Sequence, residues 1–160
     1  MIIDDLQNPE SRKWIHFTDT VMGGISSGKL AYQIDDNEKY YRLTGDVNTE
    51  NNGGFIQFAT EIKKVDNNNF TGIRLRVRGN GESYQLHLRT RMTKLPWQYY
   101  SQEFITTEDW NVVELPFSKF KKSNFYQPKS FKPNAIRSIG IVAIGKDFQA
   151  EIDLAHIEFF

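Results

Sequence analysis

Cysteine is absent from this chain of 160 residues, and its absence narrows the possible chemistry. Without thiols the chain has no disulfide, thiolate nucleophile, zinc finger or iron–sulfur site, which suits a reducing compartment. No signal peptide is visible either, because Met1, Ile2 and Ile3 are followed at once by the acids Asp4 and Asp5 and no longer apolar run comes after them. No apolar run is long enough to span a membrane. We therefore expect a soluble, cytoplasmic protein without a membrane span.

An excess of either charge is also lacking. Lys plus Arg and Asp plus Glu both number 20, which gives a formal net charge of zero. A generally basic nucleic-acid-binding protein and an acidic disordered tail are thereby excluded. The length is close to the prior of about 150 residues per domain, and no composition shift marks a linker. Residues 1–160 are expected to form one domain.

Long amphipathic helices are missing, and the apolar pattern has a period of two. The clearest alternation runs over Gly72–Gly79 and Tyr84–Arg91, with Asn80-Gly81 between them, which predicts a hairpin. Further strand-like runs cover Lys29–Asp35, Lys39–Asp46, Phe55–Thr60, Trp97–Thr106, Trp110–Pro116, Ile136–Ile144 and Ala150–Phe160. Only Glu61–Asp66 and Ser118–Lys122 could each supply a helical turn.

The pattern predicts an all-β fold, a sandwich or a barrel, and we favour two antiparallel sheets packed face to face. The expected core, or its immediate surroundings, contains Trp14, Phe55, Leu75, Leu86, Phe104, Trp110 and Ile139.

Signals for catalysis are weak. Gly24-Ile-Ser-Ser-Gly28 matches the serine-hydrolase elbow, but a strand pattern follows it where the elbow requires a helix, so a turn is favoured. The three histidines lie alone in strand-like runs, without metal-ligand spacing. No pair of acids suggests a glycosidase. We expect no catalytic residue, no metal and no cofactor.

One face of the predicted hairpin is rich in arginine. If Ile73, Leu75 and Val77 point inward, the intervening arginines point outward, and the next strand adds side chains to the same face. The candidate ligand-binding residues on this face are Gln85, His87, Arg89, Arg91, Trp97 and Tyr99.

So many positive side chains on one face repel each other unless acids, such as Glu61 and Glu103, or an anionic ligand neutralise them. We expect structural pairing for Arg74 and Arg76, and ligand contact for Arg89 and Arg91. A solvated or covered face is the alternative.

A second basic feature is a long connection. From Leu115 to Lys146 the chain contains seven Lys or Arg residues and no acid. The first part, residues 117–133, is predicted to be a long loop, and such loops are usually functional or poorly ordered.

Several blocks together resemble a known family. They include Phe17-Thr-Asp-Thr-Val-Met-Gly-Gly-Ile-Ser26, Glu50-Asn-Asn-Gly-Gly-Phe55 and Gly72-Ile-Arg-Leu-Arg-Val-Arg-Gly-Asn-Gly81. In this order, from about Trp14 to Ile157, they resemble the complex I intermediate-associated protein 30 family. Asn80 departs from the family, which usually has an aspartate there; asparagine keeps the turn but removes a charge.

The resemblance implies a galactose-binding-like jelly roll without catalytic activity, in a stand-alone bacterial member. It gives these signature residues a structural role: Asp19, Met22, Gly23, Gly24, Gly53, Gly54, Phe55, Gly79, Gly81 and Trp110. We expect Gly23-Gly24 and Gly53-Gly54 to have positive φ or to lie where a Cβ would clash.

Two binding functions remain open. The family's mitochondrial member is an assembly chaperone of respiratory complex I, so the resemblance implies a protein partner, such as respiratory-complex subunits. The alternative is a carbohydrate-binding module that uses the Arg/aromatic face, with Trp97 and Tyr99 as stacking platforms.

Overall fold

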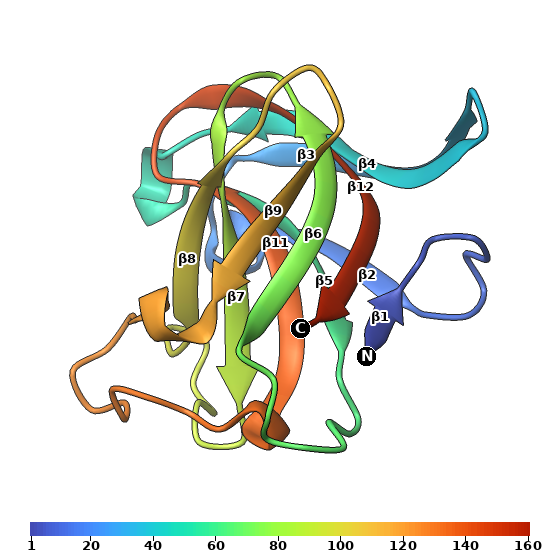
Figure 1. Ribbon diagram of the computed structural model, residues 1–160. Coiled ribbons are helices and arrows are strands. Elements are labelled where there is room, and N and C mark those ends of the chain that lie inside the picture. Colours follow the sequence, from blue (N-terminus) through green and yellow to red (C-terminus); the bar gives the residue numbers. More distant parts are fainter.

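The computed structural model describes all residues from 1 to 160 and contains two antiparallel sheets packed face to face (Figure 1). The first, sheet A, has the strand order β3 (Ser27–Asp35), β4 (Glu38–Val47), β12 (Phe148–Phe159), β6 (Gly72–Gly79) and β9 (Asn111–Pro116), with β1 (Ile2–Asp4) also paired to β12. Sheet B has the order β10 (Lys121–Lys122), β8 (Tyr100–Ile105), β7 (Ser83–Thr90), β11 (Ile136–Ile144), β5 (Phe55–Glu61) and β2 (Trp14–Thr18).

Helical structure is confined to four short 3₁₀ turns, so the predicted all-β sandwich is confirmed. These turns are η1 (Asp19–Met22), η2 (Glu50–Asn52), η3 (Phe117–Lys119) and η4 (Pro133–Ala135). The turn expected near residue 118 is therefore present. The turn expected over Glu61–Asp66 is absent: β5 ends at Glu61 and the chain continues as an irregular loop.

The core lies between the inner faces of the two sheets. Leu75, Leu86 and Ile139 are fully buried there, as the alternation predicts. Trp14 and Phe104 are also buried.

Phe55 and Trp110 are only half-buried and do not pack against the core cluster, so the expectation that they lie in the core or its immediate surroundings is wrong. Phe55 packs against Phe17. Trp110 packs against Tyr40 beneath arginine side chains on the outside of sheet A.

The predicted hairpin between β6 and β7 is wrong, because the two strands belong to different sheets. The Asn80-Gly81 turn is present, with Gly81 at φ +83°, but it carries the chain from sheet A to sheet B. A physical reason lies in the arginines of β6. Their register partners on β9 and β12 include acids, among them Glu114 and Glu158 opposite Arg74, whereas β7 would have offered His87 and another arginine.

The remaining differences concern strand ends and short edge strands. β1, β2 and β10 are absent from the predicted strands, because runs of two to five residues give little alternation to detect. The strand predicted from Trp97 begins at Tyr100, which leaves Trp97 in the preceding loop.

Candidate functional site

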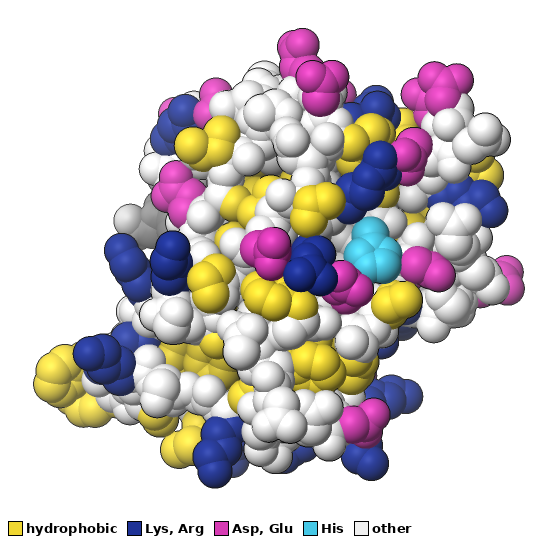
Figure 2. All heavy atoms as spheres, in the orientation of Figure 1, with side chains coloured by type: hydrophobic (Ala, Val, Ile, Leu, Met, Phe, Trp, Pro, Cys, Tyr) yellow, Lys and Arg dark blue, Asp and Glu magenta, His cyan; other side chains and the backbone are white.

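The arginines of β6 are paired with acids on the outer face of sheet A. Arg74 donates to Glu158 at 2.8 Å and to Glu114 at 3.2 Å, and Arg76 donates to Glu38. Figure 2 shows blue and magenta side chains mixed across the face formed by β6, β9 and β12. Structural pairing of Arg74 and Arg76 is thus confirmed. The acids are not the expected Glu61 and Glu103, because those two residues lie on sheet B.

Asp153 is the buried centre of this network. Its carboxylate, 2% exposed, accepts hydrogen bonds from Arg42 on one side and from Arg78 on the other, at 2.7–3.0 Å. The hydrogen bond to Asp153 raises the pKa of Arg42. The Arg78 guanidinium also lies 4.5 Å from the Trp110 ring centroid, which gives both groups a cation–π contact.

The outer face of sheet B has a polar half, formed by β7 and β8. Gln85 and His87 point outward from β7, opposite Glu103 and Ser101 of β8. Arg89 follows on the same side by the alternation of the strand, and its guanidinium lies 5.8 Å from the Tyr99 ring centroid. The Tyr99 ring stacks on His87 with 4.0 Å between centroids and 10° between planes. The Nε2 atom of His87 also lies 2.8 Å from the side-chain amide oxygen, Oε1, of Gln85.

His87 is kept neutral by these surroundings. Burial, and secondarily the charge of Arg89, lowers the pKa of His87 to about 3. Near neutral pH this imidazole is uncharged, so it is not poised as a proton donor or acceptor in that range.

Arg89 holds the loop that carries Trp97. Its Nη atoms donate to the backbone carbonyls of Leu95, Pro96 and Gln98 at 2.9–3.4 Å. Burial and the nearby charge of Arg137 lower the pKa of Arg89. The guanidinium is therefore engaged with main-chain oxygens, and no carboxylate forms an ion pair with it.

The six predicted ligand-binding residues are not all brought together. Gln85, His87, Arg89 and Tyr99 form a continuous group, and Trp97 is exposed at the end of the face. Arg91 lies beyond β7 with its side chain in solvent. Moreover, the arginines of β6 lie on the opposite side of the sandwich, so the predicted single face is wrong.

Two open hollows border the polar half. One, of about 820 Å³, is lined by Gln85, Ser101, Gln102, Glu103, Ser118, Lys119, Phe120, Lys121 and Lys129. The other, of about 330 Å³, shares Gln85 and Glu103 with it and extends to Lys146. Amide, hydroxyl and charged groups thus surround Gln85 on both sides.

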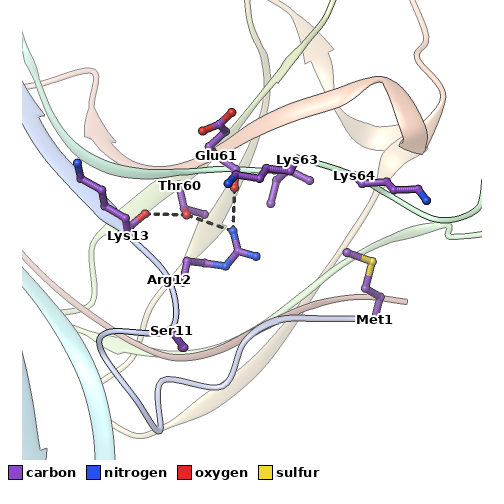
Figure 3. A pocket seen from close by; sticks show the side chains of 9 residues that line it. Met1, Ser11, Arg12, Lys13, Thr60, Glu61, Lys63 and Lys64 are labelled. Carbon is purple, nitrogen blue, oxygen red and sulfur yellow. Dashed lines mark hydrogen bonds between the residues drawn. The ribbon is translucent and has the colours of Figure 1, made fainter.

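A separate hollow of about 530 Å³ lies beside Arg12 (Figure 3). The Arg12 side chain donates to the carbonyls of Ile3 and Glu61, both at 2.8 Å, and to the Thr60 hydroxyl. These bonds tie the N-terminal segment to β5, which gives Arg12 a structural role.

The other half of the outer face of sheet B is apolar. Ile15 and Phe17 on β2 point outward beside Ala59 and Gln57 of β5. Gln57 and its neighbour Val142 on β11 are buried, so the exposed apolar surface is confined to the β2 side of this half. At the end of β2, the turn η1 exposes Val21 and Met22 to 70% and 58%. We call Ile15, Phe17, Val21 and Met22 the apolar edge.

A buried carboxylate fixes the turn at this edge. Asp19, fully buried, accepts hydrogen bonds from the Ser26 main-chain and hydroxyl groups and from the N–H groups of Gly54 and Phe55. Burial acts to raise its pKa, but these hydrogen bonds outweigh burial, and the pKa of Asp19 lies below its ordinary value.

The signature glycines make room for Asp19 or provide unusual backbone angles. A Cβ at Gly24 or Gly53 would lie 2.4 Å from the carboxyl group of Asp19. Gly23 and Gly54 have φ of +85° and +121°. Ser26, the serine of the hydrolase-like motif, is buried and bonded to Asp19, so it is not an exposed nucleophile.

No group of three or more His, Cys, Asp or Glu residues in the structure could hold a metal ion. No helix is both long and apolar enough to cross a membrane.

The profile of a known family, Complex I intermediate-associated protein 30, matches residues 4–154 of the sequence. The chain belongs to this family. In this family member, the block around Asp19 and the block around Gly53-Gly54 meet at one carboxylate. No curated protein matches the chain.

Solved structures share the fold of this family member. The family 11 carbohydrate-binding module of the cellulosomal cellulase Lic26A-Cel5E of Clostridium thermocellum has a TM-score of 0.80 at 12% identity, over 100% of this chain and 93% of that one. A family 11 module from the same organism, solved with a β-1,3-1,4-mixed-linked tetrasaccharide, has a TM-score of 0.79 at 13% identity, over 99% and 94%. A family 30 carbohydrate-binding module has a TM-score of 0.62 at 10% identity, over 89% and 80%. At such identities these likenesses show the jelly-roll fold alone.

Two features of the site are missing from the sequence-based prediction. The apolar edge could have been recognised from the alternation of Ile15 and Phe17 in the short strand β2. The nearly buried Gln57, which lies against Gly140 in the middle of sheet B, carried no comparable signal, because its neighbour comes from a distant strand.

Proposed function

We propose that this domain is a non-catalytic binding module that holds a protein partner while a larger complex is assembled. The observation that carries the proposal is the apolar edge. Ile15, on β2, and Val21 and Met22, in the turn that follows β2, are each more than half exposed, and Phe17 of the same strand packs half-buried against Phe55. Exposed apolar side chains grouped in this way are typical of protein-binding surfaces.

The apolar edge is held in place before a partner binds. Asp19 ties η1 to the start of β5, so Val21 and Met22 project from a fixed turn. A preformed surface loses less conformational entropy on association than a flexible one. Membership of the assembly-factor family also supports this proposal, with subunits of a respiratory complex as the partners to examine first.

The experiment compares three proteins by affinity capture with cross-linking from the native host. The double variant Val21→Asp/Met22→Asp places charges on the apolar edge, while Ile34→Asp, at an exposed position of β3, serves as the matched control. We expect the unaltered protein and the control to capture the same membrane-complex subunit in fixed ratio, and the double variant to lose it. Equal capture by all three proteins would contradict the proposal.

A second candidate function is carbohydrate binding at the polar half of sheet B. It is favoured by Trp97, which is 57% exposed in the loop that leads to the stacked Tyr99–His87 pair, and by the Gln85 side chain, which hydrogen-bonds to that His87. Sugars bind to such combinations of an aromatic plane and hydrogen-bonding groups. The structural neighbours include a module solved with a mixed-linked glucan oligosaccharide, which supplies a first ligand to test.

Calorimetry with that tetrasaccharide, preceded by a glycan array, tests this candidate. Binding that is lost in Trp97→Ala and Gln85→Ala but kept in Val112→Ala, an exposed position on β9, would establish it. An array without a reproducible glycan, or binding unchanged in both variants, would exclude it.

A further inference from the structure

Two neighbouring loops concentrate positive charge in a molecule whose net charge is zero. The β7–β8 loop, residues 91–99, and the connection 117–133 contain no acid. They contain these basic residues: Arg91, Lys94, Lys119, Lys121, Lys122, Lys129 and Lys132. None of them forms an ion pair in the structure. The rest of the molecule therefore carries the compensating negative charge, and this end is positive.

The same loops expose large apolar side chains. Phe125 and Tyr126, at the tip of the long connection, are 84% and 86% exposed, and Met92 and Trp97 of the other loop are 69% and 57% exposed. Figure 1 draws the connection at the lower left, and Figure 2 shows hydrophobic and basic side chains together at its tip. We call these two loops the basic–aromatic end.

The two loops are joined by hydrogen bonds and are not independent. Ser123 exchanges main-chain and side-chain hydrogen bonds with Tyr99 and donates its hydroxyl to the Trp97 carbonyl. The buried Gln127 amide donates to the Tyr99 carbonyl, and Lys122 donates to the carbonyls of Phe125 and Gln127. The aromatic tip is thus presented on an ordered loop with its main-chain oxygens partly satisfied.

We propose that the basic–aromatic end docks the domain on the surface of a bilayer that contains anionic lipids. Cations attract the negative headgroups, and exposed aromatic and aliphatic side chains insert at the boundary between headgroups and acyl chains. Peripheral binding of useful strength needs two such contributions together, and this end supplies both.

The geometry favours a bilayer over a nucleic acid. A nucleic-acid-binding surface presents aromatic rings as stacking platforms within a basic groove. Here Phe125 and Tyr126 meet edge to face, at 85° between planes, and they project from a loop tip. Such a tip can enter a lipid interface, whereas it offers no pair of parallel faces between which bases could stack.

The test is sedimentation of the full chain with vesicles of phosphatidylcholine alone and of phosphatidylcholine mixed with phosphatidylglycerol. We expect binding to the mixed vesicles only, with a blue shift of tryptophan fluorescence and a loss of binding as salt increases. Phe125→Ser/Tyr126→Ser and, separately, Lys121→Gln/Lys122→Gln/Lys129→Gln are each expected to weaken binding by roughly tenfold or more.

Matched controls separate docking from misfolding. Ile34→Ser and Lys29→Gln/Lys39→Gln remove an apolar and two basic side chains from the β3–β4 hairpin, outside the proposed docking end, and should bind as the unaltered protein does. All variants should keep the far-ultraviolet circular dichroism spectrum of the parent.

Equal binding to neutral and mixed vesicles, binding unchanged in the Phe125/Tyr126 variant, or no binding to either vesicle would overturn the proposal. So would saturable binding of a single-stranded RNA oligonucleotide by a protein that ignores both vesicles. None of these outcomes depends on the apolar edge, so the two proposals can fail separately.

Discussion

At the scale of single residues, Asp19 explains the glycines of the signature better than any ligand does. The carboxylate is buried and accepts hydrogen bonds from two segments that are distant in the sequence. Gly24 and Gly53 lie so close to it that a side chain at either position would displace it. The sequence predicted special backbone at these glycines, but the reason for it depends on a contact between two loops.

Replacing Asp19 with Asn tests this role. The amide keeps the shape but turns a donor toward N–H groups and removes the charge, which should destabilise the fold by roughly 2–4 kcal/mol. Urea unfolding at neutral pH measures the effect, and Asp36→Asn, in the exposed β3–β4 turn, is the control, with an expected change below about 0.5 kcal/mol. A loss no larger than that of the control would show that the carboxylate is dispensable.

His87 should make stability depend on pH. Its pKa is lowered to about 3 in the folded protein, below the ordinary 6.5, so the unfolded chain binds the additional proton between these values. Stability attributable to this group is therefore complete above about pH 6.5 and falls as the pH drops toward 3, at a limiting slope of about 1.4 kcal/mol per pH unit.

His87→Gln removes this titration and should flatten that part of the profile of unfolding free energy against pH. Ile34→Ser, at an exposed position of β3 that carries no titratable group, should leave the profile close to that of the parent. Identical profiles for His87→Gln and the parent would contradict the assignment of a neutral, buried imidazole.

At the scale of elements, β6 shows where sequence periodicity is informative and where it is not. The alternation located the strand and its arginines, and pairing with acids was expected. The partner strand was predicted wrongly, because Asn-Gly is equally compatible with a hairpin turn and with a crossing between sheets. Only the matching acids on β9 and β12 distinguish the two, and those strands are distant in sequence.

The ion pairs around β6 differ in burial, and we expect the buried ones to contribute more to the free energy of unfolding. Replacing Asp153 with Ala leaves Arg42 and Arg78 without their shared carboxylate, and we expect a loss of roughly 3–5 kcal/mol in chemical unfolding. Replacing Glu114, exposed and bonded to Arg74, should cost less than about 1 kcal/mol. Similar costs for both substitutions would mean that burial does not govern these pairs.

At the scale of the whole molecule, the sequence pattern predicted the sandwich but not which side chains share one of its faces. Period-two patterns placed most strands within a few residues of their observed ends, and turn residues separated them. The distribution of strands between two sheets fixes which side chains share a surface. Because β6 belongs to sheet A and β7 to sheet B, the β6 arginines lie on the opposite side of the sandwich from Gln85 and Tyr99. Ile15 and Val142, which are far apart in the sequence, point to the same side of sheet B.

The strand order has a consequence for synthesis on the ribosome. In sheet A, β12 lies between β4 and β6, and in sheet B, β11 lies between β5 and β7. Both central strands come from the last part of the sequence, residues 136–159. Until they emerge, the nascent chain can form only the separate pairs β3–β4, β6–β9 and β2–β5 and the three-stranded unit β7–β8–β10. Neither sheet can be completed before then.

We therefore expect nascent chains stalled before Phe148 to be cleaved rapidly by a protease, and chains whose β12 has left the ribosome on a carboxyl-terminal linker to resist it. Protection that arises before β12 emerges would refute this order of events. If both sheets wait for β11 and β12, the whole domain acquires its structure in one late step. Its apolar strands then stay without their central partners during most of translation, so chaperones are needed to keep the nascent chain from aggregating.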